Sequence, residues 1–297
     1  MICGMIGLGR IGGSLSRQAM EKGHQVVGYS KSDEELVALA KEGLEPAETI
    51  QALVEKLVSP RIIFLYIPHG DPTMEVCNEL KRFLRSGDIV VDGGNSHWKQ
   101  SVIRYEEFKK LKVHFLDCGT SGGIEGAREG ACFMVGGDEV AYARVEPLFK
   151  DLAVPEGTLH AGPAGAGHFS KLVHNAIEFG MLQAIGEGVA LLESSNYQFD
   201  LPALMHNWSN GSVIRGWLIE LMEKGLRENK LDTLSPHVED TREVRWAVEH
   251  ALEKEVWIPV IAQSELALYR SRDPENLSAK SVALMRHGFG GHPLHKK

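Results

Sequence analysis

The sequence is poor in cysteine, has no excess of basic residues and contains no long apolar segment. Its cysteines are four, at Cys3, Cys77, Cys118 and Cys132. They form no Cys-x-x-Cys pair, so the sequence indicates neither a zinc site nor a disulfide framework, and we expect reduced, partly buried thiols and no bound metal. The formal net charge of -8 disfavours nucleic acid as a partner, because a phosphate backbone would be repelled.

No apolar run approaches the roughly 20 residues that a membrane-spanning helix needs. The N-terminal residues MICGMIGLGR enter a strand pattern without a basic leader. We therefore expect a cytoplasmic protein with no membrane partner.

Length and composition are those of a globular protein with two domains. Hydrophobic residues make up 43% of the chain and charged residues 24%, which leaves no case for disorder. The 297 residues exceed what most single cores accommodate.

The first half alternates short apolar runs with amphipathic segments, the rhythm of a parallel sheet. The expected strands are Ile2–Ile6, Gln25–Tyr29, Ile62–Ile67, Ile89–Asp92, Val113–Asp117 and Cys132–Gly136. Helices are expected from about Gly12 to Lys22 and after Ser32, where Ser32 and Glu35 form a capping-box pattern. The pattern predicts an α/β fold of the doubly wound, Rossmann type over residues 1–165.

After the loop HAGPAGAGH the apolar residues recur at helical spacing. The first helix of this part is expected from near His168 to about Ser194. Residues 166–297 are therefore predicted to form an all-α domain, and the Gly-, His- and Lys-rich tail suits a flexible or docking segment.

A glycine-rich motif follows the first expected strand. Gly7, Gly9 and Gly12 give G-x-G-x-x-G between a strand and a helix, the context in which this motif binds a dinucleotide. The glycines allow a tight turn, close approach of a pyrophosphate and close helix packing, and the helix N-terminus faces the anion. The alternative is an ordinary glycine-rich turn. The predicted cofactor-binding residues are Gly7, Gly9, Arg10, Ile11, Gly12, Ser30, Lys31, Ser32 and Asn95.

The end of the second expected strand lacks the acidic residue that binds the ribose 2′-hydroxyl of NAD. The sequence there is Tyr29-Ser30-Lys31-Ser32, with Asp33 next. Two hydroxyls and an ammonium group suit a 2′-phosphate, so NADP is predicted rather than NAD. The alternative is that Lys31 is a solvated residue at a helix start.

Four polar residues recur on one face of the helix that opens the second domain. His174, Asn175 and Glu178 lie three, four and seven residues after Lys171, which returns all four to the same side of a helix. The rise from Lys171 to Glu178 is about 10 Å, a span that two long side chains can close around a small substrate. The alternative is a solvated helix face, but neighbouring apolar residues indicate burial, and buried polar groups need partners or a function.

These motifs resemble those of the 6-phosphogluconate dehydrogenases. The stretch GAGHFSKLVHNAIEFG is similar to the central helix of that family, as are DGGNS at Asp92–Ser96, GTSGG at Gly119–Gly123 and the ending RHGFGGH. The motifs fall in order from residue 7 to residue 292. The length resembles the short branch of the family, which lacks the duplicated helical domain.

The resemblance implies oxidative decarboxylation of 6-phosphogluconate, or a related sugar acid, to ribulose 5-phosphate and carbon dioxide, in the pentose phosphate pathway and gluconate utilisation. It implies that Lys171, with a depressed pKa, takes the proton from the C3 hydroxyl during hydride transfer and that Glu178 protonates the enediol. Asn175 completes the catalytic set. Substrate is implied to bind at Asn95, Ser121, Gly122, Gly123, His174, Arg286 and His292. A homodimer or homotetramer is also implied.

Three departures from the family pattern concern the phosphate end of the substrate. Phe179 stands where the family has tyrosine, and Leu268 stands where it has arginine. The segment before Arg245 lacks the expected glycines. Two alternatives therefore stay open, a β-hydroxyacid dehydrogenase of an unphosphorylated aldonate and a catalytically idle NADP-binding regulator.

Overall fold

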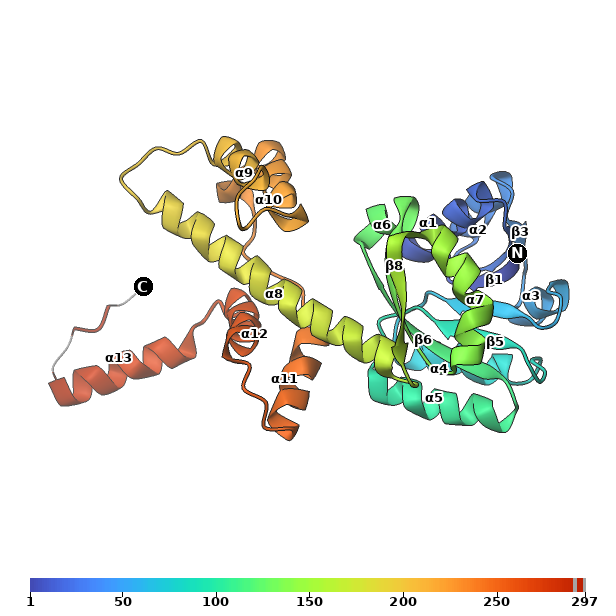
Figure 1. Ribbon diagram of the computed structural model, residues 1–297. Coiled ribbons are helices and arrows are strands. Elements are labelled where there is room, and N and C mark those ends of the chain that lie inside the picture. The colour runs from blue at the N-terminus through green and yellow to red at the C-terminus, as the bar shows by residue number, and fades with distance from the viewer. Residues whose placement is uncertain (291–292, 296–297) are drawn as a thin grey trace. The chain divides into compact units, whose positions relative to one another are not determined.

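The structure is a computed structural model that describes residues 1–290 and 293–295. The chain divides into two compact units, Met1–Val173 and His174–Lys297, and the division falls within one long helix. The first unit holds the sheet and the second is helical (Figure 1). The predicted fold class is thus confirmed. The predicted domain boundary at residues 165 and 166 coincides with the start of that helix and stays a prediction.

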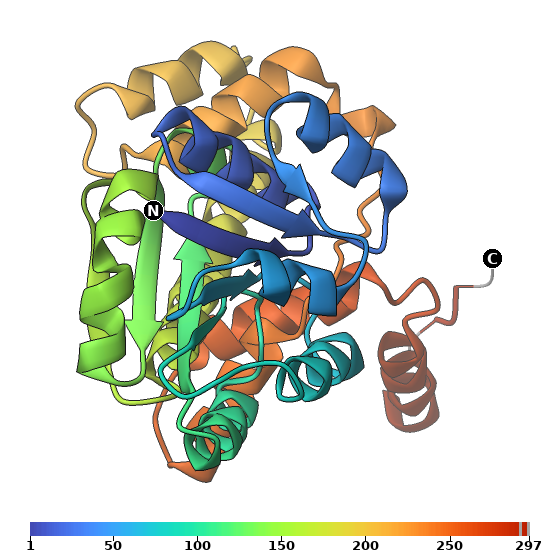
Figure 2. The same cartoon turned by 90° about the vertical axis from the view of Figure 1, so that its right-hand side faces the viewer.

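The first unit contains one eight-stranded sheet in the order β3-β2-β1-β4-β5-β6-β7-β8. Its strands are β1 (Ile2–Ile6), β2 (Gln25–Tyr29), β3 (Glu45–Pro46), β4 (Ile62–Leu65), β5 (Ile89–Asp92), β6 (His114–Ser121), β7 (Ala131–Gly136) and β8 (Ala153–Gly162). The N-terminus leads directly into β1 (Figure 2). The strands β1 to β6 are parallel, but β7 pairs with β6 in the antiparallel sense and β8 runs parallel to β7. The predicted parallel sheet is confirmed over β1 to β6, and the antiparallel pairing of β7 departs from that pattern.

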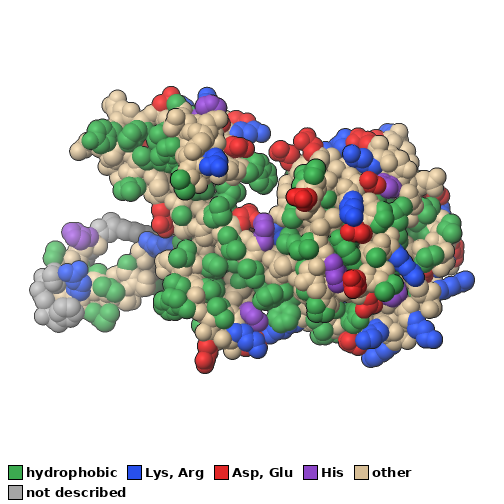
Figure 3. All heavy atoms as spheres, viewed as in Figure 1, with side chains coloured by type: hydrophobic (Ala, Val, Ile, Leu, Met, Phe, Trp, Pro, Cys, Tyr) green, Lys and Arg blue, Asp and Glu red, His purple; other side chains and the backbone are tan. Residues whose placement is uncertain are grey.

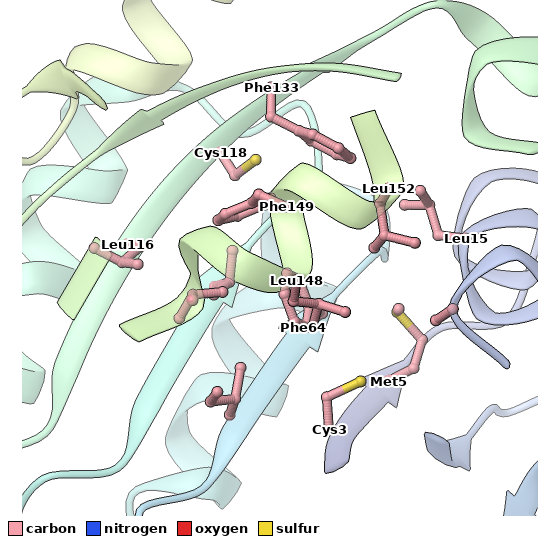
Figure 4. Packing of buried hydrophobic residues seen from close by; sticks show 14 of the residues in the cluster. Cys3, Met5, Leu15, Phe64, Leu116, Cys118, Phe133, Leu148, Phe149 and Leu152 are labelled. Carbon is pink, nitrogen blue, oxygen red and sulfur yellow. The ribbon is translucent and has the colours of Figure 1, made fainter. Parts of the chain in front are cut away.

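Seven helices of the first unit cover the two faces of the sheet. They are α1 (Arg10–Glu21), α2 (Asp33–Lys41), α3 (Ile50–Lys56), α4 (Asp71–Leu80), α5 (Trp98–Lys110), α6 (Gly123–Glu129) and α7 (Glu139–Leu152). One buried cluster packs α1, α2, α6 and α7 on one face, with aromatic contacts among Phe64, Phe133 and Phe149 (Figure 4). A second cluster packs α3, α4 and α5 on the other face. This two-sided burial holds the strand ends, and the loops after them, in fixed positions.

The second unit consists of helices around the far part of α8 (Ala166–Glu193). The others are α9 (Leu201–Ser209), α10 (Trp217–Glu228), the short 3-10 helix η1 (Leu231–Thr233), α11 (Glu243–Glu253), α12 (Pro259–Ser271) and α13 (Leu277–Gly290). A small apolar core joins α8, α9 and α10. Within the described part of the chain, no helix combines the length and apolar character that spanning a membrane requires.

The segment before α11 forces an arginine into a conformation that favours glycine. Arg242 is the N-cap of α11 and has a φ of 72°. A left-handed conformation costs a residue with a Cβ about 1–2 kcal/mol. The substitution Arg242→Gly relieves this cost. Glycine also raises the conformational entropy of the unfolded state, which favours unfolding by about 0.4–1 kcal/mol. We therefore expect the free energy of unfolding to rise by roughly 1 kcal/mol at most. Urea denaturation measures the change. Arg242→Ala, which keeps the Cβ, is the control and should give no increase.

Candidate functional site

The glycine-rich loop between β1 and α1 has the geometry of a dinucleotide cradle. Gly7 has a φ of 91°, and a Cβ on it would collide with the carbonyl oxygen of Tyr66. A Cβ on Gly12 would collide with the carbonyl oxygen of Gly7. A Cβ on Gly9 would meet only a Glu35 carboxylate oxygen, at 3.9 Å, so the backbone there is open to a ligand. The loop therefore fits a pyrophosphate at the N-terminus of α1.

The predicted cofactor residues of this loop lie between β1 and the first turn of α1, as the strand and helix pattern predicted. Arg10 and Ile11 form the first turn of α1, which begins two residues before the expected start. Arg10 is exposed, and Ile11 packs partly against the core.

The residues after β2 are arranged differently from the sequence prediction. Ser32 is the N-cap of α2, but its side chain makes no capping hydrogen bond, so the predicted capping box does not form. Instead the hydroxyl of Ser30 accepts the Ser32 N–H at 3.2 Å and donates to Glu35 at 3.5 Å. The Lys31 Nζ lies 3.7 Å from Glu75. A carboxylate, Glu35, thus stands beside Ser30 where the sequence predicted only hydroxyls and an ammonium group, and the predicted preference for NADP is not supported.

Tyr66, for which no sequence pattern indicated a role, links the loops after β1 and β5 to the end of strand β6. Its backbone lies against Gly7, and its ring lies where a Cβ on Gly93 would sit. Its hydroxyl is 3.0 Å from the Thr120 hydroxyl. Burial raises the pKa of Tyr66 well above its ordinary value, so the phenol stays protonated and able to donate.

The DGGNS loop after β5 is organised by the buried carboxylate of Asp92. It accepts hydrogen bonds from Ser96 Oγ at 2.8 Å, from the Gly94 N–H at 3.2 Å and from Arg104 at 3.3 Å. The turn presents Asn95 at the surface. The motif that suggested a substrate loop is therefore a rigid turn with one exposed amide side chain.

Asp117 holds the start of α8 against the sheet. Its carboxylate is fully buried and accepts the N–H groups of Gly165 at 2.6 Å and His168 at 2.7 Å. The His168 Nδ1 lies 2.7 Å from Ser101 Oγ, which ties α8 to α5. A Cβ on Gly119 would collide with Lys171. Lys171 therefore packs directly on β6, two residues before the strand ends at Ser121.

The four polar residues predicted to share a helix face all lie on α8. Lys171 and Asn175 are each 9% exposed, and His174 and Glu178 are half-buried. The His174 Nδ1 is 3.0 Å from the Asn175 Oδ1 and 3.8 Å from a Glu178 carboxylate oxygen. The helix thus carries a shielded amine beside an amide, with a more exposed acid two turns on.

The remaining predicted residues are spread over other elements. Ser121 ends β6, Gly122 and Gly123 begin α6 with φ values of 110° and 62°, and Arg286 is exposed on α13. The prediction for His292 lies outside the described residues. Phe179 is half-buried on α8, whereas Leu268 on α12 is 5% exposed.

The chain matches known proteins over its whole length. Residues 2–162 match the family model described as the NAD binding domain of 6-phosphogluconate dehydrogenase. The Bacillus subtilis protein YqeC, provisionally named a 6-phosphogluconate dehydrogenase, is 44% identical over 100% of both chains. An NAD(+)-dependent, decarboxylating 6-phosphogluconate dehydrogenase of Haloferax volcanii is 40% identical over 100% of this chain and 99% of its own. The solved 6-phosphogluconate dehydrogenase of Plasmodium falciparum superposes with a TM-score of 0.86 at 26% identity, covering 100% of this chain and 66% of that one.

Proposed function

The chain belongs to the 6-phosphogluconate dehydrogenase family and is an NAD(P)-dependent oxidoreductase of that type, and from this premise we propose that it oxidises and then decarboxylates 6-phosphogluconate or a closely related sugar acid. The observation that carries the proposal is Lys171, which is buried on α8 and packed against β6 near the end of that strand at Ser121. An amine held there, on a unit that also carries the dinucleotide cradle, is placed to act as a base.

When bound, the nicotinamide cofactor supplies the hydride acceptor for C3 of the sugar acid. Lys171 takes the proton of the C3 hydroxyl as the hydride leaves, and the products of this step are a β-keto acid and a protonated lysine. That ammonium group then donates a hydrogen bond to the C3 ketone oxygen while the C1 carboxylate departs as carbon dioxide. Glu178 delivers a proton to the enediol carbon, and a ketopentose results. Asn175 and His174 hold substrate hydroxyls, and Asn95, Ser121, Gly122, Gly123 and Arg286 hold the rest of the substrate.

A cofactor-reduction assay tests the proposal. Purified protein is given 6-phosphogluconate or gluconate, each with NAD and NADP, and released carbon dioxide is trapped. We expect reduced cofactor and carbon dioxide in equal amounts with at least one sugar acid. Reduction without carbon dioxide would favour the β-hydroxyacid dehydrogenase alternative, and cofactor binding without any turnover would favour the regulator.

A place in the pentose phosphate pathway or gluconate utilisation, and a cytoplasmic location, follow only if 6-phosphogluconate is the substrate, and we propose both on that basis. Phe179 and Leu268 are the observations that favour the unphosphorylated alternative, since neither offers a donor to a phosphate.

Adding a hydroxyl at the phosphate end should improve use of the phosphorylated substrate. The substitution Phe179→Tyr places a donor on α8 directly after Glu178. One hydrogen bond to a charged phosphate contributes about 1.5–3 kcal/mol, so the KM for 6-phosphogluconate should fall by roughly ten- to a hundredfold. The KM for gluconate, which has no phosphate, is the control and should not change. An equal fall for both substrates would show that the hydroxyl contacts another part of the sugar acid. The companion change Leu268→Arg, which the family pattern suggests, puts a charge at a buried position and is expected to cost stability.

We also propose a homodimer or a larger even assembly. Exposed apolar side chains line the second unit (Figure 3), among them Ile177, Met181 and Leu191 on α8 and Leu284 and Met285 on α13. A surface of this kind is typical of an interface.

Sedimentation velocity at assay concentration should give twice the chain mass or more. A fully active monomer would contradict the proposed assembly.

Removal of the residues from His287 onward should lower kcat strongly and the melting temperature little, because the tail is predicted to complete a site rather than a core.

A further inference from the structure

The carboxylate of Glu35 lies next to the place where the adenosine ribose of a bound dinucleotide would lie. In this fold the pyrophosphate lies on the glycine loop, and the ribose next to it lies at the end of β2. One Glu35 oxygen is 3.5 Å from the Ser30 hydroxyl, just after β2. The other is 3.9 Å from the position that a Cβ on Gly9 would take. The carboxylate therefore lies between the loop that receives the pyrophosphate and the strand end that receives the ribose.

The other polar groups near the end of β2 have their own partners, so Glu35 is the group best placed to bind the ribose. The Ser30 hydroxyl is engaged by the Ser32 N–H and by Glu35 itself. The Lys31 side chain is 75% exposed and lies 3.7 Å from Glu75, so its charge is shared with a carboxylate and directed to solvent. Arg10 is the one charged residue within the sequence of the glycine loop, and it is exposed in the first turn of α1.

We infer that Glu35 accepts hydrogen bonds from the hydroxyls of the adenosine ribose and makes the protein select NAD over NADP. A carboxylate accepts two hydrogen bonds from neighbouring hydroxyls. A 2′-phosphate would instead place one or two negative charges against that carboxylate, in a corner whose lysine already faces a glutamate. The inference concerns cofactor binding alone, so it stands or falls separately from the identity of the sugar acid proposed above.

The sequence pattern did not indicate Glu35 as a ribose-binding acid because this residue does not lie at the end of β2. It lies five residues beyond Ser30, in the first turn of α2, where a glutamate three residues after a serine is interpreted as part of a capping box. The fold brings it back to the strand end because α2 starts beside the glycine loop.

Calorimetric titration of the cofactor-free protein with ADP-ribose and with 2′-phospho-ADP-ribose tests this inference without any turnover. The variants are Glu35→Gln, which keeps the shape and the hydrogen bond to Ser30, and Glu34→Gln, which removes the same charge from the exposed neighbouring residue. We expect the wild type to bind ADP-ribose about tenfold or more tightly than its 2′-phosphate. Glu35→Gln should reduce that ratio by about tenfold, and Glu34→Gln should change it by less than about twofold.

Two outcomes would overturn the inference. The first is tighter binding of the 2′-phosphorylated fragment by the wild type, which would place Arg10 or Lys31 on the phosphate. The second is an equal shift in both glutamate variants, which would show a general effect of net charge. Circular dichroism melting of each variant confirms that the compared proteins are folded.

Discussion

Replacement of Lys171 by methionine is expected to lower kcat by about a thousandfold or more while leaving the affinity for NAD(P) nearly unchanged. Methionine keeps the length and apolar stem that pack on β6 at Gly119, so the fold should persist. In the proposed mechanism the neutral amine of Lys171 is the base for the C3 hydroxyl, and the ammonium group formed from it is the donor to the ketone, so both chemical steps should fail. Steady-state rates with sugar acid and cofactor, together with calorimetric titration of the cofactor alone, separate the two effects.

Glu178→Gln is the matched comparison on the same helix face, two turns away. It should slow the protonation of the enediol more than the hydride step, so a burst of reduced cofactor should precede a slow steady state. Near-normal turnover in Lys171→Met would exclude Lys171 as the base, and a loss of cofactor affinity equal to the loss of kcat would make its role structural.

The sequence was sufficient to predict those elements whose signal is local. The strands β1 and β2 are continuous apolar runs between turn residues, and their observed bounds equal the predicted ones. The helix predicted from near His168 to about Ser194 is observed at Ala166–Glu193, because a long helical period is hard to mistake.

The strands that were missed, or whose direction was not predicted, lie at the edges of the sheet or next to them. The strand β3 is two exposed residues, and β8 contains Pro155 and Gly157 and is mostly outside the core, so neither shows the apolar pattern of a buried strand. The reversed direction of β7 is set by its pairing with β6. Pairing is a long-range property that residue patterns do not contain.

The placement of the candidate residues was predictable where a motif lies on one element and not where contacts cross between elements. The shared helix face of Lys171, His174, Asn175 and Glu178 followed from their spacing on α8, and their roles stay a prediction. Glu35 was misinterpreted because its partner is Ser30 rather than Ser32. Asp117 was seen only as the end of an expected strand, although its partners lie about fifty residues further along the chain.

Asp117 is expected to be one of the most sensitive positions of the first unit. Its carboxylate is 0% exposed and accepts two short hydrogen bonds from N–H groups at the start of α8. A hydrogen bond to a charged group contributes about 1.5–3 kcal/mol, and a buried N–H left without an acceptor costs about 1–3 kcal/mol. Asp117→Ala should therefore lower the free energy of unfolding by about 3–5 kcal/mol, which urea denaturation of the cofactor-free protein measures.

The conservative variant separates the stability of the chain from the placement of helix α8, which carries the proposed catalytic residues. Asp117→Asn keeps one carbonyl oxygen as an acceptor but puts an amide nitrogen against one of the two N–H groups, so it should lose about half as much stability. Because Lys171 lies one turn beyond His168 on α8, the folded Asn variant should also show a lower kcat. Its affinity for ADP-ribose should change little, because that fragment is proposed to bind at the ends of β1 and β2. An Asn variant with full stability and full kcat would show that the N–H groups of Gly165 and His168 find other acceptors, and that Asp117 does not position the helix.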